Sequence, residues 1–236
     1  MRSCLIQLLI TVAVVFALVW FGLPFGASWL ATNALSAAGF TGTDTKVTVS
    51  ADLPPRILLG HADKIQLTSS DASVGGLYAA SIDVTLSDVE LIDRTFASVK
   101  GTLTGVRVPA PNGDPVTIDA VSVAGVGTAA DATLTMSTAA AESLAASQIK
   151  SQIGTQATVK LSAPNIVKIT INGQAAPGRL VVRDGELLMV PDSTALPTVT
   201  LIGAGHGNPF VFTSVRVGAD TVTLDGTIDL QSLLGL

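Results

Sequence analysis

The stretch RILLGHADKIQLTSSD, residues Arg56 to Asp71, contains a corner that the sequence uses a second time. The second copy is KSQIGTQATVKLSAPN, residues Lys150 to Asn165, and the two align when Gly60 is placed on Gly154. Each copy has an apolar turn, a glycine stop, four residues and then an alternating strand pattern. The matched pairs are Arg56 with Lys150, Leu59 with Ile153, Ile65 with Val159, Leu67 with Leu161 and Thr68 with Ser162.

The repeated corner has two interpretations. Both copies are short and made of common residues, so the match can arise by chance. Alternatively, each copy begins a helix-and-sheet unit that cannot bury its own apolar face and must stack on a second unit. The second interpretation predicts a single domain over residues 31–236 with two similar halves, about 54–136 and 137–236.

Composition limits the class of protein. The chain has 236 residues, a formal net charge of −5 and 13% charged residues, about half the usual charged share. No basic patch that could neutralise phosphates stands out, so we expect no nucleic-acid partner. The only cysteine is Cys4, so the rest of the chain offers no disulfide, cysteine metal site or catalytic thiol.

The first 30 residues have the character of a signal anchor or a signal peptide. Residues 5–23 are apolar except for Gln7, Thr11 and Gly22, and a run of this length can span a bilayer. Small residues at 26–28 would suit cleavage, so an uncleaved anchor and a cleaved signal are both open. Either alternative places the rest of the chain, the body over residues 31–236, outside the cytoplasm. It would be anchored to the cell membrane or secreted.

The body follows mainly the period of two that is typical of strands. Residues 82–86 alternate Ile, Val and Leu, and the pattern then shifts by one residue to Val89. Similar shifts occur within residues 99–108 and 116–123. A shift moves the side chains to the other face of a sheet unless a bulge absorbs it. We therefore expect long, bulged and strongly curved strands.

One segment breaks this pattern and predicts a helix. In residues 137–154, Ser137 or Thr138 can cap the start and Gly154 can end it. Turn signals at 172–173, 184–185 and 218–220 predict hairpins. The fold class we expect is α+β, with a long curved antiparallel sheet wrapping one principal helix.

A resemblance to a known family rests on the first copy of the corner and on two other segments. The matching positions are Pro54 or Pro55, Ile57, Leu58, Leu59, Gly60, Ile65 and Leu67, with the apolar leader before them and FTSVRVGADTVTLDGTI, residues 212–228, after them. Over roughly residues 28–231 the chain resembles the actinobacterial lipomannan elongation factor family of exported phospholipid-binding proteins. The resemblance implies a fold similar to tubular lipid-binding modules, in which a curved sheet and a long helix enclose an elongated apolar cavity.

The function we expect is extracytoplasmic and membrane-associated: holding or transferring phospholipid in an apolar groove for maintenance of the cell envelope. Phospholipid and membrane are the expected partners, and protein partners stay unspecified. An envelope domain with a filled core and no ligand is the alternative. The candidate lipid-binding residues are Leu144, Ala145, Ile149 and Ile153 on the helix, and Ile82, Val84, Leu86, Val121, Val123, Val215 and Val217 on strands.

Catalytic motifs are weak throughout the sequence. His61 follows the glycine stop, where we expect an exposed loop, and His206 lies in the glycine-rich loop GAGHGNP. Ser147-x-x-Lys150 matches a nucleophile motif, but it lies near the end of the predicted helix instead of at its start. We therefore expect no enzyme activity, no metal and no cofactor, with an envelope hydrolase as a third alternative.

Overall fold

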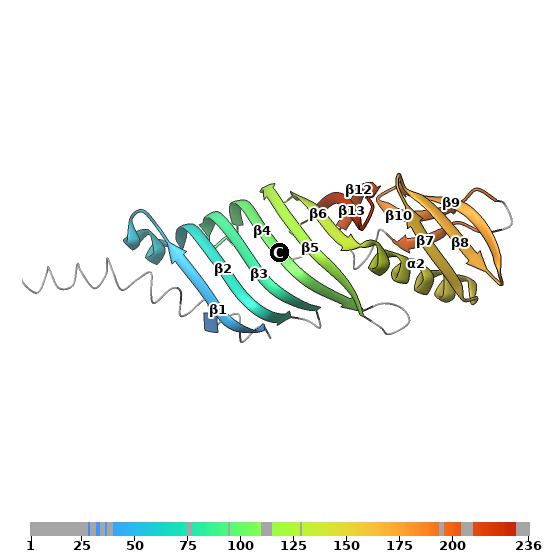
Figure 1. The fold of residues 1–236 in the computed structure, drawn as a ribbon. Helices are drawn as coiled ribbons and strands as arrows, with labels where there is room; N and C mark the ends of the chain where they lie inside the picture. Colours follow the sequence, from blue (N-terminus) through green and yellow to red (C-terminus); the bar gives the residue numbers. More distant parts are fainter. Residues whose placement is uncertain are drawn as a thin grey trace, which may run out of the picture.

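The structure is a computed structural model, and it describes residues 28, 32–33, 36, 40–74, 77–93, 95–109, 115–127, 129–193, 196–203 and 210–229. Figure 1 shows an elongated molecule with a broad curled sheet at one end. A helix and a second, smaller sheet lie at the other end.

The larger sheet has eight antiparallel strands in the order β1-β2-β3-β4-β5-β6-β13-β12. Its first six strands follow one another along the chain, and the last two return from the C-terminal part to pair with β6. The strand bounds are β1 Thr41–Ser50, β2 His61–Val74, β3 Leu77–Glu90, β4 Thr95–Pro109, β5 Pro115–Val126, β6 Ala129–Ser137, β12 Phe210–Val217 and β13 Thr221–Asp229. A short 3-10 helix, η1 (Pro54–Leu59), connects β1 to β2.

The smaller sheet has five antiparallel strands in the order β11-β10-β9-β8-β7. Their bounds are β7 Ala157–Ser162, β8 Ile166–Ile171, β9 Gln174–Arg183, β10 Glu186–Pro191 and β11 Val199–Ile202. The predicted turns at Asn172-Gly173 and Asp184-Gly185 join β8 to β9 and β9 to β10, and all four residues have positive φ. The predicted turn at 218–220 joins β12 to β13.

Left-handed residues within the strands lie near shifts in the alternating pattern. Asp71, Asp88 and Gly105 lie within strands and have φ values of 47°, 48° and 57°. Residues in this left-handed conformation interrupt the regular pleat, so the side chains beyond them change face. The pairing of β2 with β3 and of β3 with β4 continues in register on both sides of them. The prediction of long and curved strands is confirmed, with strands of up to 15 residues in the curled sheet. In this sheet, register shifts of the bulge type occur instead between β1 and β2 and between β12 and β13.

The repeated corner has the same backbone geometry in both copies. Gly60 ends η1 with φ 83° and ψ 14°, and Gly154 ends the helix α2 (Thr138–Ile153) with φ 77° and ψ 6°. Both are left-handed caps whose N–H groups bond back to the preceding turn, a conformation that glycine adopts without strain. Ser137 caps the start of α2 as predicted, accepting a hydrogen bond from the Ala140 N–H at 3.2 Å.

The position of α2 differs in part from the prediction. The fold is mostly antiparallel sheet with one principal helix, which confirms the α+β class at this level. However, α2 packs mainly on β7 and β11 of the smaller sheet and reaches only β5, β6 and β13 of the larger one. The curled sheet therefore continues well beyond the helix, towards β1 (Figure 1).

The predicted division into two halves falls at Ser137, where β6 ends and α2 begins. The second half contributes β12 and β13 to the sheet that the first half starts. Of the predicted leader over residues 1–30, only Ser28 is among the described residues. The described part of the chain contains no helix that is long and apolar enough to cross a membrane.

Candidate functional site: an apolar trough and the cluster at its edge

The larger sheet carries three rows of directly paired side chains on one face, which we call the trough face. Every position in these rows is apolar or glycine, except that the first row continues from Ile82 to the buried Ser69 on β2. The first row is Ile82, Leu103, Val121, Leu134, Leu224 and Val215; the second is Val47, Leu67, Val84, Gly101, Val123, Ala132, Gly226 and Phe212; the third is Val49, Ile65, Leu86, Val99, Gly125, Ala130, Ile228 and Phe210.

The opposite face of the same strands is polar. Asp83, Thr85 and Ser87 alternate with the trough residues of β3, and Thr133 of β6 donates a hydrogen bond to Asp225 of β13 at 2.9 Å. Successive side chains of a strand point to opposite faces, so each strand divides into an apolar and a polar side. The sheet thus offers one water-facing surface and one surface that avoids water.

The trough face is the inner surface of the curl. Val47, Val49 and Val99 are buried to 3–8% exposure, yet η1 is the only described helix with substantial contact to β1–β4. Curling of the sheet brings the apolar side chains towards one another, as the clusters around Val49 and Val99 show. Ile57 of η1 packs in the same cluster as Val47 and Val49, and within the described residues α2 has no substantial contact with β1–β4.

Six of the predicted lipid-binding residues lie together on the trough face. All six are half-buried and pack against the core without being enclosed by it. They are Ile82, Val84, Leu86, Val121, Val123 and Val215. Sequence reasoning missed Ile65, Leu67, Leu103 and Leu134, which lie in the same rows and are equally half-buried.

The helical candidates belong to a closed core. Ala145 and Ile149 are 0% and 1% exposed, and Val217 is 3% exposed. A void of only about 10 Å³ separates α2 from the sheets, lined by Leu144, Ala145 and neighbouring apolar residues. A space of that size holds one water molecule at most, so the groove expected between helix and sheet is filled by side chains. Leu144 and Ile153 are half-buried at the margin of this core.

The Ser147-x-x-Lys150 motif lies beside a groove of about 540 Å³ between α2 and the start of the smaller sheet. Ser147 is 6% exposed, and its hydroxyl donates to the Leu144 carbonyl at 3.0 Å. The hydroxyl is thus engaged with its own helix, and Lys150 is exposed in the last turn. His206 and its glycine-rich loop, residues 204–209, lie outside the described residues.

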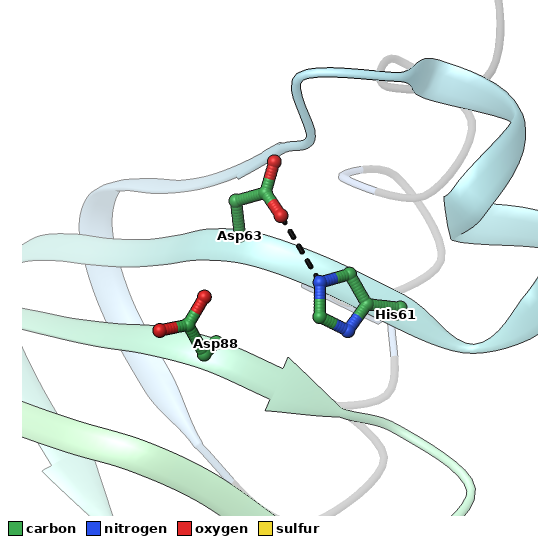
Figure 2. Close-up of side chains that lie close together, drawn as sticks. All are labelled: His61, Asp63 and Asp88. Atoms are coloured by element: carbon green, nitrogen blue, oxygen red, sulfur yellow. Dashed lines mark hydrogen bonds and ion pairs between the residues drawn. The ribbon is translucent and has the colours of Figure 1, made fainter.

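His61 belongs to a polar cluster at the start of β2, and Figure 2 shows it with Asp63 and Asp88. The expectation of an exposed loop is wrong, because His61 begins β2 and its side chain is 15% exposed. Its Nδ1 lies 2.6 Å from Oε1 of Glu90, and its Nε2 lies 3.0 Å from Oδ1 of Asp63. Glu90 is directly opposite His61 on β3, which explains how residues 29 positions apart come together.

Hydrogen bonding and charge shift the pKa values of His61 and Asp63 in opposite directions. The hydrogen bond to Glu90 raises the pKa of His61 above 6.5, with burial opposing the rise and Asp63 adding to it. The Asp52 N–H donates to Asp63, and this bond lowers the pKa of the Asp63 carboxyl below 3.8 against the effect of burial. Arg56 adds a contact of 3.3 Å from Nη1 to Oδ1 of Asp63. The cluster therefore ties η1, β2 and β3 together.

His61, Asp63 and Asp88 could also supply ligands to a divalent ion. One ligand atom from each lies within 4.8 Å of the other two, and Figure 2 shows Asp88 reaching towards the pair from β3. With Nε2 on an ion, Nδ1–H would donate to Glu90 in the manner usual for metal-binding histidines. However, a protonated imidazole between two carboxylates explains the same geometry without an ion.

Comparison of the chain with protein-family models, with curated proteins and with solved structures finds no match.

Proposed function

We propose that this chain is an extracytoplasmic, membrane-associated protein that binds phospholipid acyl chains on its trough face and holds or transfers them for maintenance of the cell envelope. The observation that carries this proposal is the set of three rows, apolar or glycine except where the first row reaches Ser69, with half-buried side chains over much of β2–β6. A plain core would be covered by a second layer. Of the strands β2–β5 that carry these rows, only β5 has substantial contact with α2.

The size of the exposed trough suits one acyl chain. The half-buried apolar side chains run from β2 to β6, and five strands spaced about 4.8 Å apart make a path of about 19 Å. One leaflet of a bilayer has a hydrocarbon depth of about 15 Å, half of the roughly 30 Å core. Burying ten methylenes would stabilise the complex by about 8 kcal/mol before the losses of association.

The resemblance to the lipomannan elongation factor family supports the same proposal. Its members bind phospholipid in tubular modules made of a curved sheet and a helix, and this chain combines a curled sheet with one principal helix. The apolar run at residues 5–23 supports placement of the body at the outer side of a membrane. The proposed role requires no catalytic group, metal or cofactor.

Native mass spectrometry of the full chain, purified in detergent, tests the proposal. We expect co-purifying phospholipid, and we expect Val84→Trp to remove most of it because the indole fills the trough. The matched control is Thr85→Trp, since Thr85 is the next residue on β3 and lies on the polar face. Lipid retained to the same extent in Val84→Trp and Thr85→Trp would overturn the proposal, provided that both variants have the far-UV circular dichroism of the wild type.

A ligand-free envelope domain is the second candidate function. The observation that favours it is the closed packing around α2, where Ala145, Met189 and Leu224 are all 0% exposed. A preparation that carries no lipid and takes none up from phosphatidylcholine vesicles would favour this second function. Such a protein would use its curled sheet as a scaffold for interaction.

A further inference from the structure

Exposed aliphatic side chains gather at one end of the strands of the curled sheet. The described residues include eight large hydrophobic side chains classed as exposed, and six of them lie in or beside the connections β1–β2, β3–β4 and β5–β6. In an antiparallel sheet these three connections lie at the same end of the strands. We call their six side chains the apolar lip. They are Leu53, Leu58, Leu59, Leu91, Ile92 and Val126, with exposures between 45% and 80%.

The apolar lip is held in place by its backbone. Ile57 is buried in the core, so the two following residues of η1, Leu58 and Leu59, point away from it. The Leu91 N–H donates to the Gly60 carbonyl at 2.6 Å, which joins the β3–β4 turn to the end of η1. The Gly127 N–H donates to the Ala97 carbonyl at 2.9 Å and fixes the β5–β6 turn. Exposure of these leucines therefore results from fixed geometry.

Ser28, which follows the apolar run 5–23 by five residues, lies close to this end of the strands. The Val49 N–H, near the end of β1, donates to the hydroxyl of Ser28 at 3.1 Å. Residues 24–27 alone separate Ser28 from the apolar run 5–23, and five extended residue steps reach at most about 18 Å. A bilayer entered by residues 5–23 would thus begin within about 18 Å of the strand end that leads into Leu53.

We infer that the apolar lip inserts into the outer surface of a lipid bilayer and seats the edge of the trough on it. The lip is purely aliphatic, which suits hydrocarbon, and exposed aliphatic patches are a usual sign of membrane or partner contact. Glu90 and Asp93 lie beside it, so we expect insertion to need no anionic lipid. This inference goes beyond the proposed function, because the lip can dock whether or not the trough holds a lipid.

Depth-dependent fluorescence quenching tests the docking. The full chain carrying Cys4→Ser is labelled at a single new cysteine, Leu59→Cys or Ile92→Cys, and reconstituted in phosphatidylcholine vesicles. The matched controls are Ile166→Cys and Val211→Cys, which are also exposed apolar positions but lie at the smaller sheet and on β12. We expect nitroxide-labelled lipids to quench the lip positions several-fold more than the controls, and iodide to quench them less.

Equal quenching of lip and control positions by the nitroxide lipids would overturn the inference. Protection of the lip from iodide without quenching by the lipids would also overturn it, because a protein surface or a second copy would then be the occupant. A second design keeps the label at Val126→Cys and adds Leu58→Ser, Leu59→Ser and Ile92→Ser. We expect lipid quenching at position 126 to fall at least threefold, and an unchanged value would again contradict docking. Lipid binding in the trough is read by mass spectrometry, so the two proposals can fail separately.

Discussion

His61 and Glu90 face each other across β2 and β3, with Nδ1 of the imidazole 2.6 Å from Oε1 of the carboxylate. This pair joins the strand that follows η1 to the strand that leads into Leu91 and Ile92. The position of the apolar lip relative to the trough therefore depends on a contact that includes a titratable imidazole.

The stability of the protein should depend on pH through this pair. The raised pKa of His61 means that the contact stabilises the fold fully below pH 6.5, and that this stabilisation is lost as pH rises through the higher folded pKa. We expect Glu90→Gln to lower the free energy of unfolding at pH 6 and to have a smaller effect at pH 9, measured by urea unfolding. Asp93→Asn, in the neighbouring turn, is the control. An effect of Glu90→Gln that is the same at both pH values would contradict this assignment.

Asp63 should contribute in the opposite pH range. Its pKa is lowered chiefly by the hydrogen bond from the Asp52 N–H, so its stabilising effect is present above pH 3.8 and lost as pH falls through the lower folded pKa. We expect Asp63→Asn to reduce the shift in unfolding midpoint between pH 5 and pH 2 relative to wild type. Acid unfolding followed by circular dichroism measures this, and an identical pH dependence in wild type and variant would disprove it.

Ile149 should behave as a core residue. It is 1% exposed within the cluster between α2 and the sheets, so Ile149→Ala should lower the free energy of unfolding by about 2–5 kcal/mol. Ile153→Ala, at the half-buried end of the same helix, should have a smaller effect. Urea unfolding of the full chain in detergent gives both values. A loss below about 1 kcal/mol for Ile149→Ala would mean that this part of the core is loosely packed.

The two glycine caps should respond differently to alanine. A Cβ built at Gly154 would meet no neighbouring residue within 4 Å. Gly154→Ala should therefore lower the free energy of unfolding only by the cost of a left-handed backbone, about 1–2 kcal/mol. A Cβ at Gly60 would lie 2.7 Å from Cγ1 of Ile92, so Gly60→Ala should be more destabilising. The thermal unfolding midpoints of the two variants compare them directly. Equal losses would show that Ile92 does not pack on Gly60 as described.

The left-handed position at Asp88 should tolerate glycine but not a β-branched side chain. Its φ of 48° is left-handed, a region in which β-branched residues are strongly disfavoured and glycine is not. We expect Asp88→Val to be the more destabilising change and Asp88→Gly to be close to neutral, as measured by urea unfolding. The reverse order would contradict the left-handed backbone at this position and, with it, the explanation of the pattern shift.

Local signals in the sequence predicted much of the fold. The helix was expected at 137–154 and spans Thr138–Ile153, because Ser137 and Gly154 are local caps whose effect does not depend on distant residues. The turns at Asn172-Gly173 and Asp184-Gly185 were predictable for the same reason. The shifts in strand pattern predicted interruptions of the regular pleat, and left-handed residues at Asp88 and Gly105 lie at two of these shifts.

Long-range pairing could not be predicted in this way. The three rows are continuous only because β13 returns to pair with β6, which joins Leu224 to Leu134 across 90 positions of sequence. No local pattern specifies that partner. For the same reason the contact of His61 with Glu90 could not be predicted, because strand pairing brings the two together although they are far apart in the sequence. The full burial of Ala145 and Ile149 could not be predicted either, because an apolar stripe on a helix does not reveal which sheet covers it.

The central claim is that acyl chains bind on the trough face. The most direct measurement is photo-cross-linking of the full chain with a phosphatidylcholine that carries a diazirine on its acyl chain, followed by peptide mass spectrometry. We expect adducts on β3, β4 and β5 at trough positions such as Val84, Leu103 and Val121, and none at Thr85 or Ser122 of the polar face. Adducts distributed equally over both faces, or absent from all three strands, would contradict the claim.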